Sequence, residues 1–216
     1  GCRNLEKASI KSDKLTVKKS CFAFSNKLTS VEFNCKHLSL HHRCFENCSS
    51  LNSISFLNLE DITLQSYVFN ECNSLSKVNI NSGSLIKLDD KSFFGQSSIK
   101  SIRLSAQSIE YPNNFEIKCN SLIEIWFESK KGLVLSQSMF YRLQQLKSVK
   151  IKTEGTIKMK QFCFVDMNNL ETVEVTGDEI EMETYCFYNC SSLKNVTLST
   201  SIKKIYPYTF KKCISL

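Results

Sequence analysis

Apolar residues return along this chain at a nearly fixed interval, and the stretch from Cys44 to Phe56 shows the arrangement in one copy. With Phe45 as position 0, a Cys stands at +3, a Leu at +6 and apolar residues at +9 and +11, while Leu38 and Leu40 precede it at −7 and −5. The pattern recurs in steps of 23 or 24 residues, with an aromatic residue at position 0 in Phe22, Phe45, Phe69, Phe93, Phe140, Phe164, Phe187 and Phe210. Such a period indicates a solenoid, whose units bury their apolar faces by stacking on one another.

Two short segments of each unit alternate apolar and polar residues, which is the period of a half-buried β-strand. The first holds positions +9 and +11, as in VEF, ISF and IWF, and the second precedes position 0, as in LTV, LSL and ITL. Because every unit repeats the same phase, strands of one kind should lie parallel in neighbouring coils, with their middle residues facing outward. In YPNNFEIKC the aromatic shifts to Phe115 and Glu116 takes position 0, so we expect a local bulge there.

The motif LxxIxF, followed by a second apolar pair and Phe-x-x-Cys, resembles the BspA-like class of leucine-rich repeats over essentially the whole chain. The resemblance implies a repeat solenoid, a right-handed leucine-rich-repeat superhelix with parallel β-strands on the concave face and little helix. It also implies adhesion or recognition, as in surface proteins of bacteria and of protists such as trichomonads. The chain departs from the family pattern by its few Pro and Gly residues and by Gln96, Leu143 and Met167 where Cys is common.

The repeat runs from end to end, so we expect a single domain, 1–216, of about nine repeats, with both ends of the array truncated because no polar cap is evident. The 28 basic and 21 acidic residues give a net charge of +7 and a mixed surface, which does not indicate nucleic-acid binding. Basic residues cluster in 142–160 and acidic residues in 161–183, and we expect them to face each other across neighbouring coils. No segment approaches the ~20 apolar residues of a membrane span.

The cysteines keep the phase of the repeat. Six of the eleven occupy position +3 and four occupy −1, while Ser, Gln, Leu or Met stands at +3 in other units. This exchange is typical of a small buried side chain rather than of an obligatory disulfide. Adjacent parallel coils also hold their Cβ atoms farther apart than the ~3.8 Å that a disulfide favours. We therefore predict mostly free, buried thiols.

One coil gathers residues of the types that zinc binds, namely Cys35, His37, His41, His42, Cys44 and Cys48. The last two cysteines belong to ladders that other coils repeat without His, and Lys or Asp replaces the paired histidines elsewhere. We therefore expect no metal site and no cofactor. The chain also has no catalytic motif and no Gly-rich phosphate loop, so we expect no enzyme activity.

Two functional classes remain open. The first is a non-catalytic protein-protein recognition module, a cell-surface or secreted fragment that binds a host, a matrix or another cell. The second is a cytoplasmic scaffold or structural protein with reduced thiols, able to assemble end to end. The family resemblance favours the first, and both predict protein partners.

The candidate binding site comes from the outward residues of the concave strands. Trp126, the only Trp of the chain, falls between Arg103 and Lys150 on neighbouring strands, and Glu124 and Glu128 face outward beside it. A Trp can hold two cations over its ring faces, and Trp and Arg are enriched in the residues that dominate binding energy at interfaces. We therefore expect these five residues to form the centre of a partner-binding face. The alternative is that they only brace the irregular coil around Glu116.

Overall fold

The structure is a computed structural model that describes residues 2–95 and 98–216. This part of the chain contains sixteen β-strands and no helix, with nearly every coil contributing two strands. The strands are β1 (Lys7–Lys11), β2 (Lys14–Val17), β3 (Ser30–Asn34), β4 (His37–Leu40), β5 (Ser53–Leu57), β6 (Asp61–Leu64), β7 (Lys77–Asn81), β8 (Leu85–Leu88), β9 (Ser101–Ala106), β10 (Ser108–Glu110), β11 (Glu124–Ser129), β12 (Leu133–Leu135), β13 (Ser148–Thr153), β14 (Thr156–Met159), β15 (Thr172–Met182) and β16 (Asn195–Ile205).

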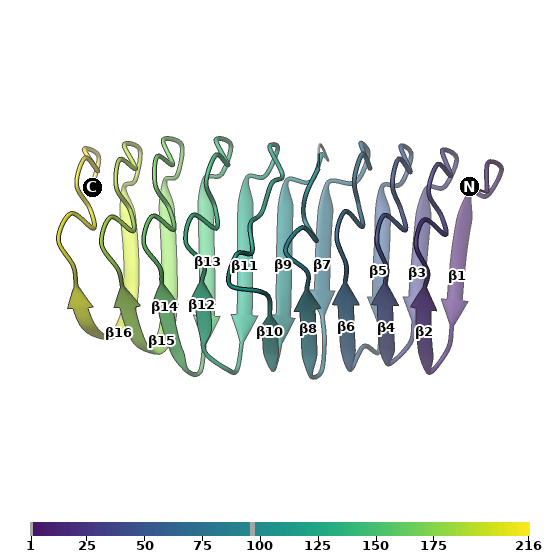
Figure 1. The fold of residues 1–216 in the computed structure, drawn as a ribbon, viewed down its shortest axis with the longest axis horizontal. Helices are drawn as coiled ribbons and strands as arrows, with labels where there is room; N and C mark the ends of the chain where they lie inside the picture. The colour runs from purple at the N-terminus through teal and green to yellow at the C-terminus, as the bar shows by residue number, and fades with distance from the viewer. Residues whose placement is uncertain (1, 96–97) are drawn as a thin grey trace.

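The strands form two layers that run the length of the molecule, and Figure 1 shows the coils side by side in a row. We call one layer the broad sheet, which consists of β1, β3, β5, β7, β9, β11, β13 and the first halves of β15 and β16; its strands β5 and β7 lie side by side without a ladder between them. The narrow sheet consists of the remaining strands and the second halves of β15 and β16. Every described ladder is parallel, so the parallel repeat solenoid expected from the sequence is confirmed.

The core lies between the two sheets and follows the repeat. The Leu at +6 is inaccessible in seven coils, at Leu28, Leu51, Leu75, Leu122, Leu146, Leu170 and Leu193. The aromatic residues at position 0 stack on one another along the solenoid, with ring centroids 4.8 Å apart for Phe140 and Phe164 and 4.7 Å apart for Phe164 and Phe187. Each coil therefore buries its apolar side chains mainly against the coils before and after it, as a solenoid requires.

The turn around position 0 is held by backbone conformations that the sequence does not signal. In seven coils the residues at −2 and +2 both have positive φ, and they include bulky residues such as Tyr67 (φ 61°) and Phe24 (φ 61°). A non-Gly residue in this region costs roughly 1–2 kcal/mol. Hydrogen bonds between coils offset this cost, since the N–H of Phe24 donates to the carbonyl of Glu46 at 2.8 Å and that of Asn47 to the carbonyl of Asn70 at 2.8 Å.

The cysteines at +3 bond to the neighbouring coil. Cys72 Sγ donates to the carbonyl of Phe45 at 3.0 Å, and Cys190 Sγ donates to that of Phe164 at 2.9 Å. Cys48, Cys119 and Cys213 repeat the contact with the residue at position 0 of the coil before them. All eleven cysteines are thiols and eight of them are buried. The sequence predicted the burial but not this ladder of thiol donors.

The coil of Phe115 and Glu116 is irregular, as expected, but its form differs from a bulge. Phe115 and Ile117 are both inaccessible and flank Glu116, the N–H of Phe115 donates to the carbonyl of Pro112 at 3.0 Å, and Lys118 forms an isolated bridge to Phe94 of the preceding coil. Register shifts among the described strand pairs lie between β15 and β16 instead. In the irregular coil itself, β10 does not pair with β12, and the hydroxyl of Tyr111 donates to the carbonyl of Val134 at 3.0 Å.

Candidate functional site

The residues of the candidate site stand on three adjacent strands of the broad sheet, β9, β11 and β13. Trp126 lies directly opposite Arg103 on one side and Lys150 on the other. Their side chains alternate with the buried Ile125 and Phe127, so they face away from the core. The alternation and the register that the sequence predicted therefore place these three residues in one column across the sheet.

Both cations lie over the indole ring, as the spacing predicted. The guanidinium carbon of Arg103 is 3.4 Å from the ring centroid of Trp126, and the ammonium of Lys150 is 5.4 Å from it. Lys150 is also bound by Glu174 in the next strand, at 2.8 Å. The column thus runs Arg103, Trp126, Lys150, Glu174. Lys150 has a carboxylate partner, whereas Arg103 has none among the residues that the structure describes.

The column borders a hollow of about 360 Å³ on the outer surface of the broad sheet. Four of the five predicted site residues line it, together with others, and the lining consists of Lys77, Asn79, Ser101, Arg103, Glu124, Ile125, Trp126, Ser148 and Lys150. The fifth, Glu128, does not belong to this hollow. It pairs with Lys152 at 3.1 Å and lines a separate hollow of about 330 Å³ at the carboxyl-terminal ends of the strands.

Among the residues of the hollow that the sequence prediction did not include are two on β7. Lys77 and Asn79 stand on β7, opposite Ser101 and Arg103. The outward positions +8 and +10 of that unit hold both of them, so the repeat frame contained the signal. The prediction extended only one strand to each side of Trp126 and therefore did not include β7.

The indole nitrogen of Trp126 is inaccessible and has no hydrogen-bond partner among the described residues. An unmade hydrogen bond of a buried donor costs about 1–3 kcal/mol. The other outward residues at this position are all polar or charged, such as Ser9, Ser55 and Thr197. Stability alone therefore gives little reason for a Trp at this place in the sheet.

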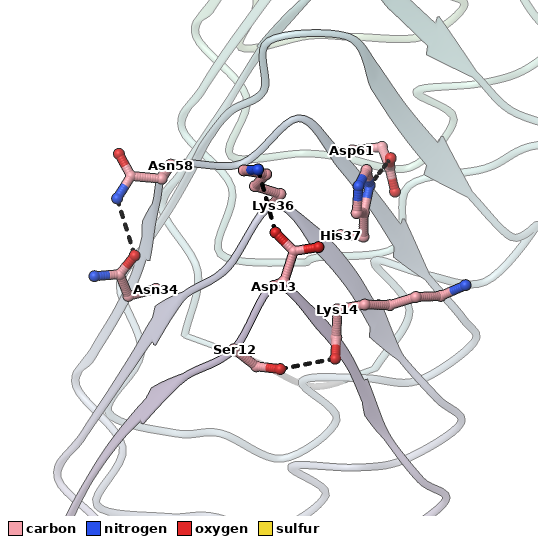
Figure 2. A network of polar contacts seen from close by, with 8 residues as sticks. All are labelled: Ser12, Asp13, Lys14, Asn34, Lys36, His37, Asn58 and Asp61. Atoms are coloured by element: carbon pink, nitrogen blue, oxygen red, sulfur yellow. Dashed lines mark hydrogen bonds and ion pairs between the residues drawn. The ribbon is translucent and has the colours of Figure 1, made fainter.

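The residues of the possible zinc site lie on opposite sides of the chain. Cys35, Cys44 and Cys48 are buried in the core, whereas His37 faces outward and its Nδ1 lies 2.5 Å from Asp61 Oδ2. Figure 2 shows this pair in a row of polar contacts along the edge of the first coils, beside the ion pair of Lys36 and Asp13. Among the described residues, no group of three or more His, Cys, Asp or Glu side chains is arranged to hold a metal ion.

The charged blocks of the sequence pair across neighbouring coils, as expected. Besides the pair on Trp126's column, Lys158 binds Glu181 at 3.2 Å and Lys160 binds Glu183 at 2.7 Å. All of these groups are partly exposed, and surface pairs of this kind contribute about 0–1 kcal/mol each. Three pairs thus join the basic block to the acidic block, and they need no binding function to explain them.

The comparison with protein families is decisive for the class of the chain. The family profile described as "BspA type Leucine rich repeat region" matches six copies, over residues 1–63, 62–157 and 118–216. The chain belongs to the BspA-type leucine-rich repeat family. No curated protein matches the sequence.

A solved structure from the same repeat class also matches. It is a leucine-rich repeat protein from Bacteroides ovatus ATCC 8483, at 14% identity, with a TM-score of 0.31, over 97% of this chain and 85% of that chain. Within the described residues of the BspA-type chain, no helix has the length and apolarity to cross a membrane.

Proposed function

We propose that this chain is a non-catalytic protein-recognition module that binds its partner on the outer surface of the broad sheet, with Trp126 at the centre. The observation that carries the proposal is the stack of Arg103 on the indole at 3.4 Å beside an open hollow. Trp and Arg are the residues most enriched among those that dominate interface energetics, and repeat proteins commonly meet their partners on such a sheet. Glu124 and Lys150 complete the rim, and Glu128 lies in the adjoining hollow.

The rival explanation, in which the stack only braces the irregular coil, is less well supported. Trp126 is on β11, which pairs with β9 and β13 over its full length through backbone hydrogen bonds, and these do not involve the indole side chain. The irregular segment near Glu116 is anchored by its own contacts, with the ring of Tyr111 4.8 Å from that of Phe115. The stack is therefore available for binding rather than required for the ladder.

The setting that the family favours is a cell surface, where the module serves adhesion or binds a host or matrix protein. The alternative setting is the cytoplasm, where a scaffold with reduced thiols agrees with the burial of eight of the eleven cysteines. Immunofluorescence on intact and on permeabilised cells distinguishes the two. Signal on intact cells supports the surface role, and signal only after permeabilisation supports the scaffold.

End-to-end association of copies is a second proposal, and it rests on a separate surface. The last coil exposes large apolar side chains, with Ile214 83% and Leu216 56% accessible. Exposed apolar side chains of this kind favour contact with another apolar surface. Sedimentation velocity tests it: association that rises with concentration supports the proposal, and a monomer at all concentrations contradicts it.

A random peptide library displayed on phage tests the binding function directly. Peptides selected on the wild-type protein are measured against Trp126→Ala and against a matched control, Ser55→Ala, which changes the same outward position on β5. We expect at least about 30-fold weaker binding to Trp126→Ala, which corresponds to about 2 kcal/mol, and unchanged binding to the control. Equal affinity for all three proteins refutes the site. A lower melting temperature of Trp126→Ala with unchanged affinity supports the bracing explanation instead.

A further inference from the structure

We infer that the group recognised in this hollow is a carboxylate, carried by an Asp or Glu side chain of the partner protein and bound by Arg103. The inference rests on the proposed function, because it specifies the chemistry of the partner at the same site. It follows from the charged side chains around Trp126, some of which form an ion pair within the described residues while others do not.

Arg103 is the cation of the column that is available to bind an external carboxylate. Its guanidinium lies flat enough on the indole to bring Cζ within 3.4 Å of the ring centroid, and the side chain is exposed. Among the described residues it has no carboxylate within ion-pair distance and no hydrogen-bond acceptor. A guanidinium stacked by its face keeps its N–H donors at the edge of the plane, where they match the two oxygens of a carboxylate.

Of the other cations near the hollow, two are paired with carboxylates of this chain and one is not. This difference directs the partner's carboxylate to one end of the hollow. Lys150 and Lys152 are held by Glu174 and Glu128, at 2.8 and 3.1 Å. Lys77 has no such partner among the described residues and lies on β7, diagonally across from Arg103. Diagonal neighbours of adjacent strands are about 7–8 Å apart, within reach of two long side chains. A carboxylate on Arg103 can therefore also meet the ammonium of Lys77.

Glu124 limits how much negative charge the hollow accepts. It lines the same hollow from β11, is exposed, and has no cation within ion-pair distance among the described residues. The Glu124 carboxylate would repel each anionic group of the partner that came close to it by roughly 1 kcal/mol in a well-hydrated site. The site therefore favours a single carboxylate with neutral or cationic neighbours over a polyanionic segment.

The one Trp of the chain makes the test specific, because its indole N–H gives one resolved NMR signal. The probes are blocked glutamate and its neutral isostere blocked glutamine, both as N-acetyl methylamides, titrated into the ¹⁵N-labelled protein. We expect blocked glutamate to shift the indole signal saturably, with a dissociation constant of about 1–10 mM, and blocked glutamine to bind at least about tenfold more weakly. Arg103→Gln should abolish the shift, Arg103→Lys should weaken it, and Glu124→Gln should strengthen binding severalfold. Ser55→Ala, on the same face, should change nothing.

Failure of this inference is distinguishable from failure of the proposed function. Equal shifts from the two probes, or an unchanged response of Arg103→Gln, overturn the carboxylate. Peptides selected from the library that depend on Trp126 but contain no enriched Asp or Glu also overturn it and leave the recognition function standing. Absence of any Trp126-dependent peptide overturns the function itself.

Discussion

The hydrogen bonds of the cysteines at +3 predict that the stability difference between a Ser and an Ala variant has opposite signs at Cys72 and Cys35. Cys72 is inaccessible and its thiol donates to the carbonyl of Phe45 at 3.0 Å. Cys35 is 2% exposed, and its thiol makes no hydrogen bond within the described part of the chain. Replacing each by Ser and by Ala separates the hydrogen bond from the packing, because Ser keeps a donor and Ala keeps neither the donor nor the sulfur.

The magnitudes follow from what each variant removes. Ala at either position loses the burial of about one methylene equivalent, about 0.8 kcal/mol, together with a small cavity. At Cys72 it also loses one hydrogen bond, about 0.5–1.5 kcal/mol. The lower part of that range applies, since the carbonyl of Phe45 still accepts the N–H of Cys48 at 3.1 Å. We therefore expect about 1.5–2 kcal/mol for Cys72→Ala and about 1 kcal/mol for Cys35→Ala.

The Ser variants give the reversal. Cys72→Ser retains a donor toward Phe45, so it should be more stable than Cys72→Ala by about 0.5–1 kcal/mol. Cys35→Ser buries a hydroxyl with no partner, so it should be less stable than Cys35→Ala by about 1 kcal/mol or more. The assay is urea unfolding followed by far-ultraviolet circular dichroism under reducing conditions. If Ser and Ala rank in the same order at both positions, the thiol at +3 acts through packing alone and the ladder has no energetic role.

The remaining predictions concern the core, thiol reactivity and alkaline pH. Leu51→Ala should cost about 2–5 kcal/mol of unfolding free energy because Leu51 is inaccessible, whereas Ser55→Ala should be nearly silent; equal shifts in thermal melts would show that the repeat frame is wrong. Cys163 is inaccessible and burial raises the pKa of its thiol, whereas Cys213 is half-buried, so iodoacetamide at neutral pH should alkylate Cys213 well before Cys163, and mass spectrometry of the native protein that finds the reverse order refutes this. Burial raises the pKa of Cys48 to about 11, so the unfolded chain loses this proton first, and the contribution of this thiol to the unfolding free energy should fall by up to about 1.4 kcal/mol per pH unit from about pH 9 toward 11. Urea unfolding at about pH 8 and about pH 10 measures the fall, which should be smaller in Cys48→Ser.

The repeat frame was sufficient to predict the solenoid and the column of Trp126. Both depend on register, and register follows from an apolar pattern that recurs with little variation, because a slip by one residue would turn every core side chain outward. For the same reason the frame placed Arg103 and Lys150 on either side of the indole without knowledge of any distance. It could not show that Glu174 matches the charge of Lys150, since that depends on which of several rotamers the lysine adopts.

Other features depend on backbone geometry that residue types do not reveal. Positive φ at Tyr67 or Phe24 has no sequence signal, because Gly and Asn are the residues normally associated with it. Hydrogen bonds to the next coil impose the conformation there. The break between β10 and β12 likewise depends on how Tyr111 packs, with its hydroxyl bound to the carbonyl of Val134. The sequence showed only that this coil was irregular.

The most direct test of the account uses Trp126 as its own reporter. A peptide selected on the wild-type protein is titrated while the fluorescence of this single Trp and the binding signal from biolayer interferometry are both recorded. The account predicts that the emission shifts and saturates with the same dissociation constant as binding, because the partner covers the hollow beside the indole. Saturable binding with unchanged emission would place the partner elsewhere on the solenoid and contradict the account.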